Sequence, residues 1–397
     1  MTQPAQSTSN PLLQLWRNQE SRGVIIQIIT MAVVFALLAA IARNVVINLE
    51  AVGKEFSFGF LLWPAAYDIG FSPFLEYTNQ STHLRAAVVG LLNTLLIAFW
   101  GCILATMVGF VLGIMRLSSN WLVSKLSYAF VEFMRNVPIL IHILAIYAMV
   151  VTLLPPAKKA LNVGADAFFL SNRGFYVPSP VFEDGATIVG VVLLISIVLV
   201  YFFKRWARRQ QDDTGKIYPV LWVSLGILVA LPGIAFVATG MPLSWDIPVL
   251  KGFNFKGGMA IKPEFLALWL ALSLYTACFI AEIVRAGILA VSHGQTEAAF
   301  ALGLRPNRTL QLIIIPQALR VIVPPLCSQY LNLTKNSSLA IAIGYMDITA
   351  TLGGISLMQT GKEMETMLIV MGVYLVISLL ISSFMNWFNH RIKLTER

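Results

Sequence analysis

Charged side chains within long apolar runs are the residues of this chain best placed to do chemistry. Glu132 and Arg135 stand three residues apart, as do Glu282 and Arg285. This spacing puts each pair on one face of a helix, where its two charges can meet. Ionisable residues are costly inside apolar helices and are functional candidates by default. For these two pairs we favour a bundle-stabilising ion pair over a contact with a substrate.

A second polar group surrounds the adjacent prolines Pro324 and Pro325. Proline removes a helix hydrogen bond, and backbone groups freed at membrane depth must line a cavity or bond to side chains. We therefore expect a helix break here, with a translocation pathway beside it. The residues predicted to line this pathway are Arg320, Asn332, Lys335, Asn336, Ser337 and Ser338. The last three offer hydrogen bonds suited to a zwitterion, and ordinary helix capping is an equally good interpretation of them.

Motifs for enzymatic chemistry are missing from the sequence. Its Gly-Lys pairs lack the upstream glycine and the following Ser or Thr of a phosphate-binding loop, so any ATP would be hydrolysed by another subunit. The three cysteines stand singly in apolar segments and the four histidines are scattered. We expect no catalytic residue, no metal site and no cofactor in this chain.

A polar, Ala-rich insert at 294–316 separates two long apolar segments. Ser292 and Gln295 have the spacing of a capping box, which predicts a short helix through Leu302. Gly303 should end that helix, and Pro306 should start the next one, because proline is tolerated in a first helical turn. The pattern predicts two helices joined at a sharp glycine corner, a segment we call the elbow (292–316).

The composition shows that these segments belong to a membrane protein. The chain is 57% hydrophobic and 12% charged, with a mean hydropathy of +0.76, whereas soluble domains have about 25% charged residues. A spanning helix needs about 20 apolar residues. Eight runs qualify, at about 24–42, 86–114, 123–153, 186–203, 219–239, 265–290, 309–333 and 366–388. We predict an all-α, polytopic transmembrane helix bundle of about eight spans, the third of them bent at Pro138.

The distribution of charge predicts the orientation. With both termini cytoplasmic, the outward segments hold 11 Lys and Arg against 12 Asp and Glu, and the other side holds 17 against 7. This arrangement places Glu297 in the cytoplasm. We interpret the net charge of +9 as a topology signal and an anchor for anionic membrane lipid, not as a sign of nucleic-acid binding.

The beginning of the chain has two interpretations. Residues 1–22 are polar and are expected to be disordered. The apolar run that follows could mimic a cleaved secretory signal. We favour a retained helix, because the run is long for a signal core and its removal would conflict with the charge bias.

Several motifs, in the right order, resemble those of a known family. The integral-membrane subunits of bacterial ABC importers share a pattern that is filled here by Glu297, Ala298, Ala299, Gly303, Ile313, Ile315 and Pro316, with Ile315 replacing the family's Leu. The segments at 90–99, 131–140, 267–288, 316–326 and 335–344 look like those of the polar amino-acid permeases of histidine, glutamine and arginine uptake systems. The resemblance covers about 85–155 and 264–390.

This resemblance implies a type I importer permease in the bacterial inner membrane. The helix at 297–303 would dock on a cytoplasmic ATPase, which binds ATP and Mg, and would turn the membrane helices between inward-facing and outward-facing states. One chain supplies one coupling helix for a pair of ATPases. A second copy of this chain or a sister permease is therefore implied, and the long insertion favours a sister of different sequence. An extracytoplasmic amino-acid-binding protein is implied as well.

The chain departs from the family's minimal length by an insertion. We divide it into a disordered N-terminus (1–22), a first helix and outer loop (23–85), a first core part (86–153), an insertion with two spans (154–263), a second core part (264–390) and a basic tail (391–397). For the insertion we favour packing against the core or lipid over contact with a binding protein.

Two other classes of function compete with the importer. An ion-coupled secondary transporter would need intramembrane acids, which are few here, and would not need the elbow. A membrane anchor or sensor would explain the spans but not the proline-rich segment after the elbow.

Overall fold

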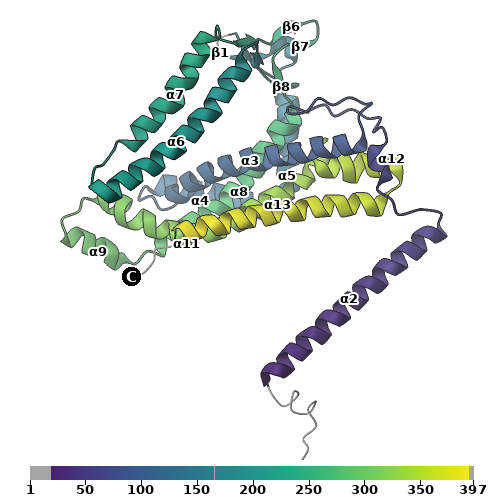
Figure 1. Cartoon of the computed structure of the whole chain (residues 1–397), viewed down its shortest axis with the longest axis horizontal. Coiled ribbons are helices and arrows are strands. Elements are labelled where there is room, and N and C mark those ends of the chain that lie inside the picture. Colours follow the sequence, from purple (N-terminus) through teal and green to yellow (C-terminus); the bar gives the residue numbers. More distant parts are fainter. Residues whose placement is uncertain (1–18, 165, 393–397) are drawn as a thin grey trace, which may run out of the picture.

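A computed structural model describes residues 19–164 and 166–392, which form a bundle of long helices with a group of short strands at one end (Figure 1). Seven of these helices are long and apolar enough to cross a membrane, or eight spans if one bent pair counts as one. This confirms the polytopic helical fold. Residues 1–18 and 393–397 lie outside the described residues, so the disorder expected for 1–18 stays a prediction, whereas residues 19–22 of the same N-terminal segment are the beginning of helix α2.

The helices follow the predicted runs closely. The long ones are α2 (Gln19–Ala51), α3 (His83–Met115), α6 (Ala186–Thr214), α7 (Val220–Ala238), α8 (Pro263–Leu289), α11 (Ile315–Asn336) and α13 (Glu363–Ile392). The shorter ones are α4 (Trp121–Asn136), α5 (Ile139–Leu153), α9 (His293–Ala301), α10 (Pro306–Thr309) and α12 (Leu357–Thr360). Short 3₁₀ turns are η1 (Gly59–Leu62), η2 (Ala157–Lys159) and η4 (Ser337–Ile343), and π-helical turns are η3 (Leu310–Ile314) and η5 (Thr349–Ser356).

The third predicted span is a sharply bent pair. α4 and α5 meet at 107°, with Pro138 as the residue before α5. Proline forces the preceding residue out of helical geometry, and Val137 is indeed extended, at φ −98° and ψ 133°. The predicted bend is confirmed, and its size means that α4 and α5 cannot both run along the membrane normal.

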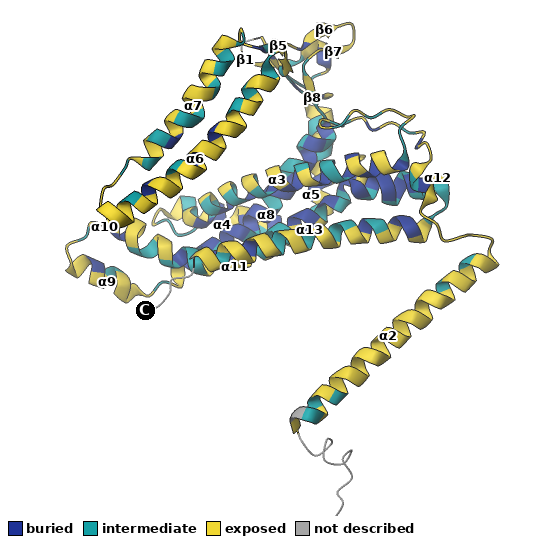
Figure 2. Ribbon diagram, viewed as in Figure 1, coloured by how far each residue is buried: buried dark blue, intermediate teal, exposed yellow. Residues whose placement is uncertain are grey.

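The core is built on close contact between α3 and α8. Gly101, Ala105, Gly109 and Gly113 recur every four residues along one buried face of α3. A Cβ atom at Gly109 would lie 2.7 Å from the side chain of Ile280 on α8, so larger residues would push the helices apart. Small residues at this spacing let helix backbones approach closely in membranes. Figure 2 shows that burial is concentrated on this central pair of helices, α8 most of all.

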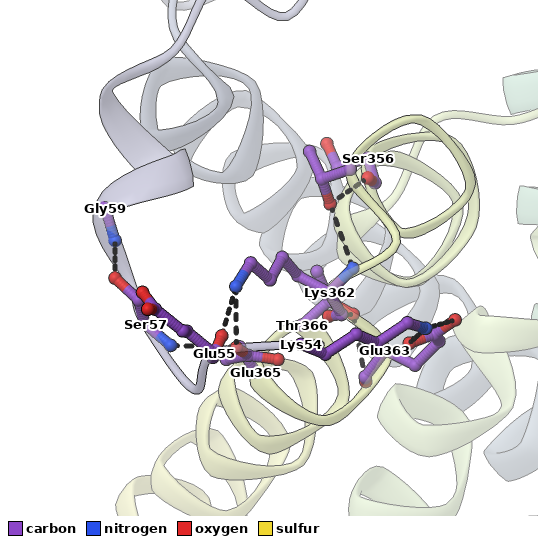
Figure 3. A network of polar contacts seen from close by, with 10 residues as sticks. Lys54, Glu55, Ser57, Gly59, Ser356, Lys362, Glu363, Glu365 and Thr366 are labelled. Atoms are coloured by element: carbon purple, nitrogen blue, oxygen red, sulfur yellow. Dashed lines mark hydrogen bonds and ion pairs between the residues drawn. The ribbon is translucent and has the colours of Figure 1, made fainter. Parts of the chain in front are cut away.

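The first helix, α2, lies apart from this core, and no residue of its apolar window is buried. It is attached through the segment that follows it (Figure 3). Lys54 Nζ bonds to both carboxylate oxygens of Glu363 at 2.9 Å, and the amide of Ser57 donates to Glu365 Oε1 at 2.9 Å. Polar contacts at the beginning of α13 therefore fix where α2 leaves the bundle.

The insertion contains strands that the all-α prediction omitted. They are β1 (Leu161–Gly164), β2 (Phe168–Ser171), β3 (Gly174–Val177), β4 (Ser179–Phe182), β5 (Leu243–Asp246), β6 (Val249–Lys251), β7 (Asn254–Lys256) and β8 (Met259–Ile261). They form an antiparallel four-stranded sheet in the order β1-β2-β3-β8 and the pairs β4-β5 and β6-β7. We call this end of the bundle the sheet end, and the end that carries α9 and α10 the elbow end.

Strands that precede the helical hairpin α6–α7 pair with strands that follow it. Phe175 of β3 pairs with Ile261 of β8, and Pro180 of β4 pairs with Trp245 of β5. The ring of Phe255 packs on those of Phe169 and Tyr176, each at 4.7 Å between ring centres. The hairpin thus projects from a hydrogen-bonded base, and most of its apolar surface is exposed (Figure 2).

Candidate functional site

The elbow has the predicted glycine corner. α9 ends at Ala301, and Gly303 adopts the left-handed conformation with φ +76°. The amide of Gly303 donates to the carbonyl of Phe300 at 2.9 Å, and the amide of Leu304 donates to that of Ala299 at 3.1 Å. This pair of bonds is the Schellman arrangement, in which glycine is favoured because it has no Cβ atom. Pro306 opens α10, as expected.

The predicted capping box is wrong in its side-chain bonds. Ser292 is the residue before α9, but its hydroxyl makes no capping bond. The amide oxygen of Gln295 instead accepts a hydrogen bond from Gln317 Nε2 at 3.2 Å. Gln317 belongs to α11, so the side chain of Gln295 contacts the next long helix and makes no capping bond within α9.

The surface of α9 combines charge with exposed apolar side chains. The side chain of Glu297 is 71% exposed and lies 3.0 Å from His293 Nδ1. Phe300 and Leu302 are exposed as well, whereas Ala299 is buried. Phe300 near the end of α9 and Leu302 directly after it place two large apolar side chains in solvent-accessible positions, and sequence reasoning passed over both of them. The signal that could have found them was their apolar character in a segment otherwise interpreted as polar.

The remaining motif residues lie beyond the corner. Ile313 is in the π-helical turn η3, and Ile315 and Pro316 begin α11. Ile313 is half-buried, while Ile315 and Pro316 are exposed. The structure therefore divides the seven motif residues between the α9 corner and the start of the next spanning helix.

Both predicted ion pairs form, and the structure joins them into one cluster. Glu132 lies 3.8 Å from Arg135, and Glu282 lies 3.5 Å from Arg285. Arg135 also bonds to Glu282 at 3.0 Å, and Arg116 forms a further ion pair with Glu282. The cluster connects the end of α3 with α4 and α8. Sequence reasoning missed Arg116 because its partner lies 166 positions away.

The helix break expected at Pro324 and Pro325 is absent. α11 runs without interruption from Ile315 to Asn336. Both prolines lie on the exposed face of the helix, together with Val321. Each proline removes one hydrogen bond of its own helix, and such a loss can bend a helix without ending it.

The predicted pathway residues do not form one group. Asn332 and Lys335 are exposed on α11, Arg320, Asn336 and Ser338 are half-buried, and Ser337 is buried. The hydroxyls of Ser337 and Ser338 each donate to a carbonyl three residues earlier, at 2.8 Å. These bonds to helix carbonyls favour the helix-capping interpretation of the two serines over a role in binding a substrate. Asn332 and Lys335 have their polar groups on an open face of α11, which Ser328 extends.

A buried carboxylate, which was not predicted, comes after α11 and η4 in the chain. Asp347 is fully buried between η4 and η5. It accepts hydrogen bonds from the amide of Ala350 at 2.8 Å and from the hydroxyl of Tyr374 at 3.0 Å. Burial raises the pKa of the Asp347 carboxyl to about 6, and the hydrogen bonds oppose that rise.

Comparison with known proteins gives a consistent result. Residues 105–394 match the family described as the binding-protein-dependent transport system inner membrane component. The chain is 44% identical to the general L-amino acid transport system permease protein AapQ of Rhizobium johnstonii, over 100% of this chain and 98% of that protein. It is 44% identical to the putative amino-acid ABC transporter permease protein YhdX of Escherichia coli, over 98% and 97% of the two chains. It is 46% identical to the glutamate/glutamine/aspartate/asparagine transport system permease protein BztB of Rhodobacter capsulatus, over 95% of each.

Proposed function

Because the chain belongs to the family of inner-membrane components of binding-protein-dependent transport systems, we propose that it is the permease subunit of an ABC importer for amino acids. Relatives of the same length bear names of amino-acid permeases. The observation that carries the proposal is the elbow, in which an exposed short helix and a left-handed glycine connect two long helices. Such a segment can receive a displacement from a partner and pass it on to both helices.

The orientation follows from where the positive charge lies. Lys204, Arg205, Arg208 and Arg209 are on the last part of α6, at the same end of the molecule as α9 (Figure 1). Positive residues accumulate on the cytoplasmic side of membrane proteins. The elbow end is therefore the cytoplasmic end, and the sheet end faces outward.

In the proposed mechanism, α9 docks on a cytoplasmic ATPase. The exposed Glu297 supplies charge complementarity, and Phe300 and Leu302 supply apolar contact area. ATP and Mg are bound by that ATPase, and this chain contributes no catalytic group. When two ATPases close on ATP, α9 moves with its ATPase and tilts α8 and α11, which alternately opens the two ends of the pathway.

The pathway itself runs along the open face of α11. Asn332 and Lys335 are exposed there, in a segment that is long and apolar enough to cross the membrane. No acidic side chain within residues 19–164 and 166–392 forms an ion pair with Lys335. Polar groups at membrane depth need a water-filled cavity or a partner. A second permease, different in sequence, would close the cavity, and an outer binding protein would deliver the substrate.

Reconstitution tests this function directly. Liposomes that contain the chain, its companion permease and its ATPase, with the binding protein outside, should take up amino acids when ATP is inside. Collapse of the proton and sodium gradients should leave this uptake unchanged. The chain alone should neither hydrolyse ATP nor accumulate substrate. Gradient-driven accumulation by the chain alone would replace the importer with an ion-coupled secondary transporter.

A further inference from the structure

A small cavity lies at the sheet end, and its lining residues belong to neither α9 nor α11. Its volume is about 150 Å³, and its walls include Phe71, Lys262, Glu264, Tyr345 and Met346. It is formed by the loop before α3, the start of α8 and the segment after η4. Water occupies about 30 Å³ per molecule, so a cavity of this size can admit a single small molecule but not a folded protein segment.

The cavity brings together two opposite charges that do not pair. Lys262 and Glu264 are both half-buried. Neither forms an ion pair with the other, or with any further side chain in the part of the chain that the structure describes. Glu264 accepts one hydrogen bond, from the hydroxyl of Tyr147 at 3.3 Å. Partly buried charges without a counter-ion are unfavourable, so both side chains are suited to a ligand that carries both signs.

The walls of the cavity are held in place by packing and hydrogen bonds. The rings of Phe71, Phe265 and Tyr345 form a triangle with 5.5 to 6.3 Å between ring centres. The buried side-chain amide of Asn93 donates to the carbonyls of Phe71 and Met346, each at 2.9 Å. A site whose walls are fixed beforehand loses little entropy when a ligand binds.

We propose that this cavity binds one amino acid as a zwitterion, with the ligand's carboxylate on Lys262 and its ammonium on Glu264. A simple carboxylate or a simple amine would satisfy only one of the two charges, whereas a zwitterion gives each a charge-assisted hydrogen bond. The proposal takes its substrate class from the proposed function. It adds an outer binding site, distinct from the face that carries Asn332 and Lys335, at which substrate is held before it enters the pathway.

Binding to the assembled complex tests the site. The permeases and the ATPase, in nanodiscs without the binding protein, are titrated with radiolabelled L-glutamine, L-glutamate and L-leucine. We expect Lys262→Met and Glu264→Gln each to weaken binding about tenfold or more, because each leaves one ligand charge unpaired. Lys256→Met makes the same change at an exposed lysine of β7, outside the cavity, and should bind as the wild type does. Acetate and methylamine, which carry one charge each, should compete poorly.

Charge reversal provides a second, independent measurement. The double variant Lys262→Glu with Glu264→Lys keeps both charges, so it should bind more tightly than Lys262→Glu alone. Unchanged ATPase co-purification would show that each variant is assembled. Wild-type-like binding by the single variants, strong competition by acetate, or no binding by a transport-active wild-type complex would each overturn the proposal. A repeat of the titration with the binding protein added separates a docking surface from a binding site: variants that lower binding only in that repeat would overturn the proposal and indicate a docking surface. Absence of ATP-driven uptake by the reconstituted wild-type complex would instead refute the proposed function.

Discussion

Arg116 at the end of α3 forms an ion pair with Glu282 of α8, and the Arg116 side chain is only 6% exposed. Arg135 and Arg285 share the same carboxylate. One acidic group thus holds the end of α3, α4 and α8 together near the elbow end. Arg135 has a second, longer pair with Glu132. By contrast, within residues 19–164 and 166–392 Arg116 and Arg285 pair with Glu282 alone.

We predict that Glu282→Gln destabilises the chain strongly. Removing one partner of a buried pair leaves an uncompensated charge and costs about 3–5 kcal/mol, and the 26% exposure of Glu282 puts this case at or below the lower end. Glu132→Gln is the matched control, because its pair with Arg135 is longer, at 3.8 Å, and more exposed, and such pairs contribute under about 1 kcal/mol. Thermal unfolding in detergent should separate the two variants. Equal unfolding temperatures would contradict the prediction.

We predict that Gly303→Val uncouples transport at equal membrane abundance. Nothing lies within 4 Å of a Cβ atom built at Gly303, and its φ is +76°, so the effect comes from backbone strain alone. β-Branched residues resist this conformation, whereas asparagine tolerates it. Gly303→Asn should therefore keep most of the ATP-driven uptake. Uptake near the wild-type level by both Gly303→Val and Gly303→Asn would show that the corner does not need a residue that favours the left-handed conformation.

We predict that Glu297→Arg weakens association with the ATPase and lowers substrate-stimulated ATP hydrolysis. Reversing a charge at an interface costs several kcal/mol, about 2–5 for a close pair. The chain's own unfolding temperature should hardly change, because the side chain is 71% exposed. Asp212→Arg reverses an exposed charge on the last turn of α6 and serves as the control. Unchanged pull-down of the ATPase by Glu297→Arg would remove α9 from the interface.

We predict that Asp347 makes stability depend on pH. Burial raises its pKa from 3.8 to about 6, so the folded chain binds more protons than the unfolded chain between those values. Its contribution to stability is complete below pH 4 and is lost as the pH rises through 6. The stability of Asp347→Asn relative to wild type should therefore increase between pH 4 and 7, by about 1–3 kcal/mol. A difference that stays constant across this range would exclude the effect.

The spans and the elbow were predictable because their signals are local. Apolar runs of about 20 residues, Gly303 and Pro306 each determine the chain near themselves. Arg116 was missed because its partner Glu282 is 166 positions away. Asp347 was missed because its burial depends on elements such as α13, whose Tyr374 bonds to it from 27 positions away. The cavity at Lys262 and Glu264 was missed for a similar reason, since Phe71 and Tyr345 complete it from two other segments.

Two local rules also failed for physical reasons. Pro324 and Pro325 suggested a break, but proline is tolerated in helices of membrane proteins, and α11 continues through both residues. The strands of the insertion have only three or four residues each, too few to show an alternating pattern. Their existence depends on pairing such as that of Phe175 with Ile261, which no single stretch of sequence reveals.

The pairing of β4 with β5 brings together the two points of the chain between which the helices α6 and α7 are inserted. Phe182 and Leu243 face each other in that pair and mark the two points at which the chain leaves and re-enters the strands around α6 and α7. A deletion that joined these two positions by a tight turn would convert the pair into an ordinary β-hairpin and leave the paths of α5 and α8 unchanged. The geometry of the β4–β5 pair is thus compatible with a chain that lacks the two inserted helices.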